Sequence, residues 1–301
     1  MTKDDIFSKT LKENENERFE KQLKCKNYLQ SCYEIKDILN LANKIGKLKI
    51  EYAKTNDEKY LEEIKKTKKD IAKEFKKNNL DIKKIIPDYS CKICNDKGFL
   101  TNGEVCSCLK RKYLQNLLKY SKTDLTNFPL LNEIDVSIYA DDKNKIKLIY
   151  NILNIQKTKF NTILFSGETG TGKTYIAKSF LKTLILQNNL GLFYDSINVN
   201  QIFLNAHLNF NERESILSEL KNCDILLIDD FGNETKYNNI TKEYYLELLN
   251  LRQSNNKITI FTTNLTLKDI QQNYNERFFS RLVDKELSLK YSFTGADLRL
   301  N

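Results

Sequence analysis

The chain has 301 residues, a formal net charge of +9 and 30% charged side chains, which leaves room for one large α/β domain and a smaller unit. The residues after Met1 lack the apolar segment of a signal peptide, and no apolar run is long enough to cross a bilayer, so we expect a soluble, cytoplasmic protein with no membrane partner. With one histidine, His-based acid–base or metal chemistry is improbable. The mild positive charge favours approach to nucleic acid, but a Lys-rich composition accounts for it equally well.

Residues 1–88 are predicted to be almost wholly helical. Two apolar stripes recur at three- and four-residue steps, one from Ile38 to Tyr52 and one from Tyr60 to Phe75, with Lys and Glu between them. This pattern fits either a small helical bundle or helices that present a face to a partner. Pro87 closes the region.

Four of the seven cysteines fall in one window with the spacing C-x2-C-x11-C-x-C, namely Cys91, Cys94, Cys106 and Cys108. Between the pairs, Asn102-Gly103 predicts a two-residue hairpin turn, which would fold the second pair beside the first. Four thiolates so arranged suit a closed, structural zinc site. Disulfides or a redox pair are less expected in a cytosolic chain, whereas the spacing does not distinguish zinc from an iron–sulfur cluster. Cys25, Cys32 and Cys223 have no matching spacing and are interpreted as buried or incidental thiols.

Beyond the cysteines, apolar spacing predicts a helix over 109–118, and the polar segment 121–142, broken by Pro129, is interpreted as a linker. From about residue 143 helices alternate with apolar strands. Strands are expected at 162–165, 191–194, 224–228 and 257–261, with helices from Lys173 and over 198–208, 212–220 and 240–253. This alternation predicts an α/β fold in which helices cover a parallel sheet, with the active face at the carboxyl ends of the strands.

A phosphate-binding loop follows the first of these strands. Its sequence fills each fixed position of the pattern G-x-x-x-x-G-K-[ST] with Gly167, Glu168, Thr169, Gly170, Thr171, Gly172, Lys173 and Thr174. The glycines allow backbone N–H groups to converge on one anion, Lys173 supplies a cation for the β- and γ-phosphates, and the Thr174 hydroxyl can bind Mg²⁺. The helix that starts at Lys173 adds its positive dipole end. A strand, this loop and a helix occur in the order that the motif requires.

Two acidic residues complete the predicted nucleotide site. Asp229 and Asp230 directly follow the apolar run that ends at Ile228. We expect Asp229 to reach the Mg²⁺ shell beside Thr174, and Asp230 to orient the attacking water. Asn264, at the end of the following strand, could bond the water or the γ-phosphate, and it could also cap a turn.

Together these motifs resemble an AAA+ ATPase of the initiator and helicase-loader clade, and most closely the DnaC/DnaI family of bacterial replicative helicase loaders with a four-cysteine module. The likeness covers roughly residues 89–112 and 160–301, whereas residues 1–88 share only helical character. It implies an AAA+ P-loop fold, with residues 1–125 as a helical region that contains the zinc module at about 89–112, and residues 126–301 as the ATPase domain. By the same resemblance, residues 167–174 are Walker A, Asp229 and Asp230 are the Walker B acids, and Asn264 is sensor 1.

The resemblance also assigns three arginines. Arg281, in a segment like the family's box VII, is the expected arginine finger with Arg277 as runner-up, and Arg299 in the closing segment is the expected sensor 2. A finger supplied by a neighbouring subunit would couple turnover to self-assembly. Without the resemblance, Arg277 and Arg281 fit equally well as a surface pair bonded to Glu276 or Asp284. Many AAA+ proteins have Asp-Glu where this chain has the shorter Asp-Asp, a departure that related loaders share.

Three functions follow as hypotheses. The first is an ATPase that uses ATP, Mg²⁺ and a zinc-bound N-terminal region to deliver a hexameric replicative helicase onto single-stranded DNA. The second is a transposition-helper ATPase of the IstB type, although that group generally lacks the cysteine module. The third is a nucleotide-gated binding module with little turnover. No aromatic ladder interleaved with Arg marks a surface for single-stranded DNA.

Overall fold

The computed structural model describes residues 1–135, 159–237, 240–295 and 297–298. It divides into two compact units, one formed by Met1–Phe7 with Lys112–Asn301 and the other by Ser8–Arg111. The boundary that the sequence suggests, between residues 125 and 126, remains a proposal about where an independently folding domain begins. Among the described residues, no helix combines the length and the apolar character that a membrane span needs.

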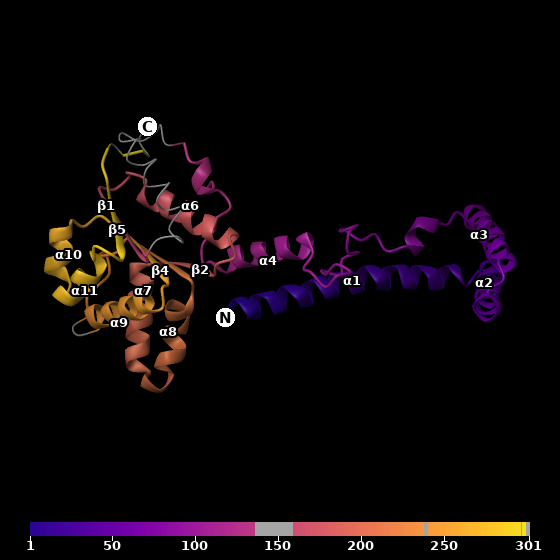
Figure 1. Ribbon diagram of the computed structural model, residues 1–301, viewed down its shortest axis with the longest axis horizontal. Coiled ribbons are helices and arrows are strands. Elements are labelled where there is room, and N and C mark those ends of the chain that lie inside the picture. Colours follow the sequence, from indigo (N-terminus) through magenta and orange to yellow (C-terminus); the bar gives the residue numbers. More distant parts are fainter. Residues whose placement is uncertain (136–158, 238–239, 296, 299–301) are drawn as a thin grey trace. The chain divides into compact units, whose positions relative to one another are not determined.

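The larger unit is built on a five-stranded sheet in the order β2-β3-β4-β1-β5, and all of its neighbouring strands are parallel (Figure 1). Its strands are β1 (Thr162–Gly167), β2 (Gly191–Asp195), β3 (Ile225–Asp229), β4 (Ile258–Thr263) and β5 (Ser288–Phe293). The four predicted strands are present, each within about two residues of its expected bounds. The edge strand β5 was not predicted, because its buried ends enclose the partly exposed run Leu289–Ser292.

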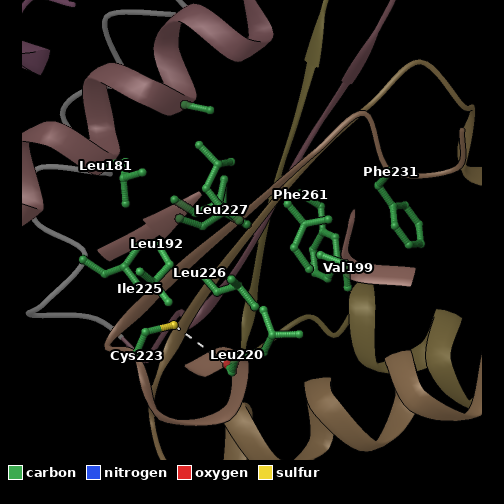
Figure 2. Close-up of a cluster of buried hydrophobic side chains, with 14 of the residues drawn as sticks. Leu181, Leu192, Val199, Leu220, Cys223, Ile225, Leu226, Leu227, Phe231 and Phe261 are labelled. Atoms are coloured by element: carbon green, nitrogen blue, oxygen red, sulfur yellow. Dashed lines mark hydrogen bonds between the residues drawn. The ribbon is translucent and has the colours of Figure 1, made fainter. Parts of the chain in front are cut away.

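Helices cover both faces of this sheet. Packed against β1 to β4 is α6 (Lys173–Leu186), while α7 (Ser196–Leu208), α9 (Thr241–Ser254) and α11 (Glu276–Leu282) also contact strands, and α8 (Arg213–Asn222) packs on α7 and α9. Figure 2 shows Leu227 beside Leu181 of α6, and Phe261 on the other side of the sheet beside Val199 of α7. Every residue of β3 is buried, as expected for a central parallel strand covered on both faces. The predicted fold class is therefore confirmed.

At the amino ends of the strands, a fully buried arginine ties three elements together. The Arg252 guanidinium donates to the carbonyls of Leu220 at 2.7 Å, Cys223 at 2.9 Å and Ile258 at 2.6 Å. Figure 2 shows Cys223 beside Leu220 in the core. Burial raises the pKa of the Cys223 thiol, and the interpretation of this cysteine as a buried or incidental thiol agrees with its 1% exposure.

The prediction of a linker is wrong for the described part of that segment, residues 121–135. Leu125, Leu131 and Ile134 are buried in the core of the larger unit. Lys182 of α6 holds the segment by donating to the carbonyls of Thr126 and Phe128. The apolar residues were missed because the segment forms only the short 3-10 turn η2 (Leu131–Glu133) and therefore shows no regular periodicity. Residues 136–142 lie outside the described residues.

The smaller unit is mainly helical, as predicted. It contains most of α1 (Lys3–Cys32), followed by α2 (Lys36–Thr55), α3 (Lys59–Lys77) and the 3-10 turn η1 (Ile82–Ile85). A short connection joins α2 and α3, which pack against each other, and a small separate cluster buries Cys32, Ile38 and Phe75. The cysteine segment leads into α4 (Ser107–Tyr120), which contains the predicted helix 109–118.

Between the two cysteine pairs lies the predicted hairpin, with a different turn. Leu100 N–H donates to the Glu104 carbonyl at 2.8 Å, and Gly103 N–H donates to the Leu100 carbonyl at 3.1 Å. Gly103 has a φ of +85°, so the loop has three residues and ends in a left-handed glycine, where the sequence predicted a two-residue turn. The Cys106 N–H donates to the Gly98 carbonyl at 2.8 Å, which returns the chain to the first cysteine pair.

Candidate nucleotide site and cysteine cluster

The loop between β1 and α6 has the backbone that the glycine spacing requires. Gly167, Gly170 and Gly172 have φ values of +142°, +81° and +88°, a region that side chains with a Cβ rarely adopt. The buried Thr171 hydroxyl donates to the Glu168 carbonyl at 2.8 Å and closes the loop on itself. Gly172 is the N-cap of α6, so the positive end of that helix dipole lies at the loop.

Lys173 points back into this loop. Its ammonium donates to the carbonyls of Gly167 at 2.8 Å and Glu168 at 2.6 Å, and to Asn264 Oδ1 at 2.8 Å. The side chain is only 5% exposed, so the cation is held where it faces the loop. Two of the predicted site residues, Lys173 and Asn264, are thus brought together from β1–α6 and from the end of β4.

Beside the lysine, a carboxylate and two hydroxyls meet. Thr174 Oγ1 donates to Asp229 Oδ1 at 2.8 Å, and the hydroxyl of Thr262 donates to the same oxygen. Asp229 is 8% exposed and ends β3, whereas Thr262 lies in β4, which pairs with β3. Carboxylate and hydroxyl oxygens are hard ligands of the kind that Mg²⁺ prefers, so Thr174 and Asp229 fit a magnesium ion. The sequence analysis assigned no role to Thr262, because β4 also contains Thr259 and Thr263 and the sequence does not show which hydroxyl faces the site.

Asp230 follows at the sheet edge with a φ of +52°, a left-handed conformation that is uncommon for a residue with a side chain. Its N–H donates to Thr262 Oγ1 at 3.0 Å, and its carbonyl accepts from Ser196 Oγ at 2.8 Å. The backbone is thus fixed on both sides while the Asp230 side chain stays exposed. A carboxylate in this position can contact a bound molecule at the carboxyl edge of the sheet.

The two predicted finger arginines lie on α11. Phe278 and Leu282 bury one face of the helix, and Arg277 and Arg281 are exposed. Within the described part of the chain neither guanidinium forms an ion pair, so the expected alternative of salt bridges to Glu276 or Asp284 is not observed there.

The segment after β5 contacts the phosphate loop. Leu298 N–H donates to the Gly170 carbonyl at 3.0 Å. A Cβ on Gly170 would lie 1.9 Å from Asp297 Oδ1, so the carboxylate is packed directly on this glycine. No sequence pattern pointed to Asp297. The predicted sensor Arg299 lies outside the described residues.

In the smaller unit, the hairpin brings the four predicted cysteines together. Their sulfur atoms all lie within 4.8 Å of one another, with Cys91 and Cys106 at 3.8 Å and Cys94 and Cys108 at 3.4 Å. A tetrahedral zinc ion with Zn–S bonds of about 2.3 Å has sulfur atoms about 3.8 Å apart. The four thiols therefore fit a closed four-sulfur metal site.

Backbone amides and a carboxylate orient this cluster. Gly98 N–H donates to Cys94 Sγ at 3.4 Å, and Asp96 accepts from the N–H groups of Ser90 at 3.0 Å and Cys91 at 2.7 Å. Lys21 also donates to Asp96 at 2.7 Å. Burial would raise the pKa of Asp96, but these hydrogen bonds and the Lys21 charge lower it overall, so the carboxylate stays ionised. Asp96 is another residue that the sequence analysis missed.

The local environment shifts the pKa values of two of these thiols in opposite directions. The N–H of Cys94, ahead of other causes, lowers the pKa of Cys91 to about 7. Burial, and then the neighbouring thiols, raises the pKa of Cys108. Sulfur atoms this close cannot all ionise unless a cation offsets their charge, which agrees with the fit of the cluster to a metal.

Comparison with known proteins supports ATP binding. The model of the family described as IstB-like ATP binding protein matches residues 98–287. The replicative helicase loader DnaC of Escherichia coli K12 is 26% identical over 124 residues, which cover 40% of this chain and 49% of that protein. The chromosomal replication initiator DnaA of Borreliella afzelii is 31% identical over 162 residues, which cover 51% of this chain and 32% of that protein.

The chain thus spans about half the length, or less, of these curated relatives. Among solved structures, the crystal structure of DnaI is similar with a TM-score of 0.46 and 20% identity, covering 56% of this chain and 92% of that chain.

Proposed function

Because the chain belongs to the family of IstB-like ATP-binding proteins, we propose that it hydrolyses ATP with Mg²⁺ and uses this reaction to load a hexameric replicative helicase onto single-stranded DNA. The family membership, the parallel sheet and the similarity to DnaC agree with the DnaC-like AAA+ protein that the sequence predicted. The loading of a helicase is the activity that the relative's name describes, and for this chain it is a proposal.

One observation carries the ATPase proposal. Thr174 Oγ1 lies 2.8 Å from the buried Asp229 Oδ1, beside an equally buried Lys173, so the expected metal and phosphate ligands converge from two strand ends. In the proposed reaction Lys173 binds the β- and γ-phosphates, and Thr174 and Asp229 hold the magnesium ion, which neutralises charge on the phosphates when bound. Asp230 and Asn264 orient the attacking water.

Arginine side chains are proposed to supply further positive charge at the γ-phosphate, some from a neighbouring protomer and one from the subunit that binds the nucleotide. Arg281 on the exposed face of α11, with Arg277 as the alternative, contacts the γ-phosphate bound to a neighbouring protomer, and Arg299 senses the nucleotide in its own subunit. Charge that develops on the γ-phosphate is then fully stabilised only in the oligomer, so hydrolysis depends on assembly.

For the smaller unit we propose a structural zinc ion bound by Cys91, Cys94, Cys106 and Cys108, in a region that binds the helicase. The sulfur separations support the metal, and the closed ligand set supports a structural role. Elemental analysis of the purified full chain should give about one zinc per chain. Iron in place of zinc, or no metal, would overturn the assignment to zinc.

The ATPase proposal is tested by phosphate release from the wild type and Lys173→Ala, with and without single-stranded DNA. Loss of the buried ammonium should lower turnover by about a hundredfold or more. Lys178→Ala is the matched control, because Lys178 lies on the same helix but packs over the rings of Phe128 and Phe193. Equal release by wild type and Lys173→Ala under all conditions would favour the nucleotide-gated module with little turnover.

A second candidate function, a transposition helper, is favoured by the name of the matching family itself. Capture experiments with the full chain separate the two. A loader should retain the hexameric helicase of its host in the presence of ATP, and a transposition helper should retain a transposase. If the chain captures the transposase and ignores the helicase, the loader proposal is rejected while the ATPase proposal stands.

A further inference from the structure

A buried carboxylate closes the loop that follows β3. Gly232 N–H donates to Glu234 Oε2 at 2.8 Å, and Asn233 N–H donates to the Asp230 carbonyl at 3.1 Å. Glu234 is only 4% exposed. The loop therefore begins at the proposed catalytic acid Asp230, and the carboxylate of Glu234 stabilises its conformation.

The second oxygen of Glu234 accepts a hydrogen bond from the hydroxyl of Tyr274. Tyr274 is 3% exposed, and its ring stacks on Phe231 with centroids 4.5 Å apart. It is the C-cap of α10 (Leu267–Asn273), and the next residue, Asn275, caps α11 by accepting from Phe278 N–H at 2.7 Å. One hydrogen bond thus joins the loop after Asp230 to the start of the helix that carries Arg277 and Arg281.

This contact is chemically unusual for the interior of a domain. A carboxylate in an aromatic cluster is costly to bury, and packing alone would be served better by an apolar residue. Burial, and then the charge of Glu234, raises the pKa of Tyr274, so the hydroxyl keeps its proton and remains a donor. The carboxylate is retained with donors on both oxygens, which makes the link between loop and helix directional.

We propose that Glu234 and Tyr274 are positioning residues for ATP hydrolysis, whose hydrogen bond holds the Asp230 loop in register with α11. The inference rests on the proposed ATPase function and assigns it two residues that do not touch the nucleotide. In a ring or filament of protomers, the bond fixes the γ-phosphate side of one site relative to the arginines offered to the next. A displacement of about 1 Å of Asp230 or of the α11 arginines is enough to lower a hydrolysis rate strongly.

The test compares Tyr274→Phe with Tyr245→Phe. Both tyrosines are buried and both rings contact Phe231, but the Tyr245 hydroxyl has no hydrogen-bond partner in the part of the chain that the structure describes. Tyr274→Phe should lower kcat about tenfold and leave the nucleotide Kd within about twofold of wild type, because only positioning is lost. Tyr245→Phe should leave both values within about twofold of wild type.

Substitutions of Glu234 test whether a conservative change preserves the positioning role. Glu234→Gln retains an oxygen for Gly232 N–H and gains an amide that donates to the Tyr274 hydroxyl, so kcat should stay within about threefold of wild type. Glu234→Leu removes both bonds and should lower kcat at least as far as Tyr274→Phe. Hydrogen exchange on residues 275–282 adds a readout independent of turnover: ATP should change protection of α11 in the wild type, and this change should be lost in Tyr274→Phe.

The outcomes separate this role from the function on which it rests. Equal kcat for Tyr274→Phe and Tyr245→Phe, in an active wild type, rejects the positioning role and leaves the ATPase intact. A Tyr274→Phe protein that also loses nucleotide affinity or melts well below Tyr245→Phe shows a merely structural contact and likewise rejects it. A wild type that binds ATP but releases no phosphate rejects the hydrolytic function and this role together.

Discussion

Residue spacing predicts both the nucleotide site and the cysteine cluster, yet the two sites are stabilised in opposite ways. In the nucleotide site the protein satisfies its own polar groups: Lys173 has three acceptors, and Asp229 accepts from two hydroxyls. In the cysteine cluster four sulfur atoms face one another, and Gly98 N–H is a donor to one of them. The first site should persist without its ligand, whereas the second should depend on a metal.

The largest expected effect is the loss of metal in Cys94→Ser. Structural zinc contributes about 10 kcal/mol or more to small domains, whereas the separate apolar cluster of the smaller unit is small, with Cys32, Ile38 and Phe75 buried in it. We expect the variant to lose bound zinc and the hairpin bridge between Phe99 and Val105 to lose its protection from hydrogen exchange. Elemental analysis and exchange measurements check both.

Cys25→Ser is the matched control, because Cys25 lies in the same unit but outside the cluster. It should retain metal at the wild-type ratio. If Cys94→Ser also retains it, the contrast between the two sites fails.

Asp229→Asn tests whether the nucleotide site keeps its structure without its ligand. The amide keeps an oxygen for Thr174 and Thr262 but removes the negative charge, so turnover should fall by about a hundredfold while the melting temperature hardly changes. Asp224→Asn is the control at the opposite end of β3, where the carboxylate accepts from Leu190 N–H at 2.9 Å. Phosphate release and thermal melting measure the two effects. Unfolding of Asp229→Asn would show that the nucleotide site is not self-sufficient.

Spacing along the chain predicted what local chemistry dictates, and missed what depends on tertiary contacts. The phosphate loop and the cysteine hairpin lie within single segments, so their residues could be found in the sequence. Thr262 joins the site only because β4 pairs with β3, and Leu131 enters the core from a segment without periodicity. The chain's charge and motifs likewise gave no sign of the buried bond between Glu234 and Tyr274, which lie 40 residues apart.

Asp96→Asn sharpens the contrast by asking how much of the cysteine cluster the protein itself holds. The carboxylate accepts from two backbone N–H groups and from Lys21, and an amide cannot replace all of these bonds. Zinc affinity should fall about tenfold to a hundredfold, as for other groups that orient metal ligands. Competition with a chelator measures it. Asp88→Asn is the control, because Asp88 is an exposed acid that pairs with Lys92; an equal effect of both variants would indicate general electrostatics.

The smallest expected effect concerns Asp297, whose negative charge should oppose a bound phosphate. Its carboxylate packs on Gly170, inside the loop proposed to receive phosphates. Two unit charges about 4 Å apart repel by about 1 kcal/mol when bulk water screens them fully, so Asp297→Asn should tighten ATP binding by at least about two- to fivefold at low salt. The gain should shrink as salt screens the repulsion.

Glu286→Gln removes one negative charge from an exposed position before β5 and serves as the control for net charge. Titration calorimetry at two salt concentrations separates the variants. If Asp297→Asn binds ATP more weakly than the wild type, the carboxylate supports the loop instead of competing with the phosphates. The protein's own groups, including the Asp297 carboxylate, would then stabilise the nucleotide site without ATP.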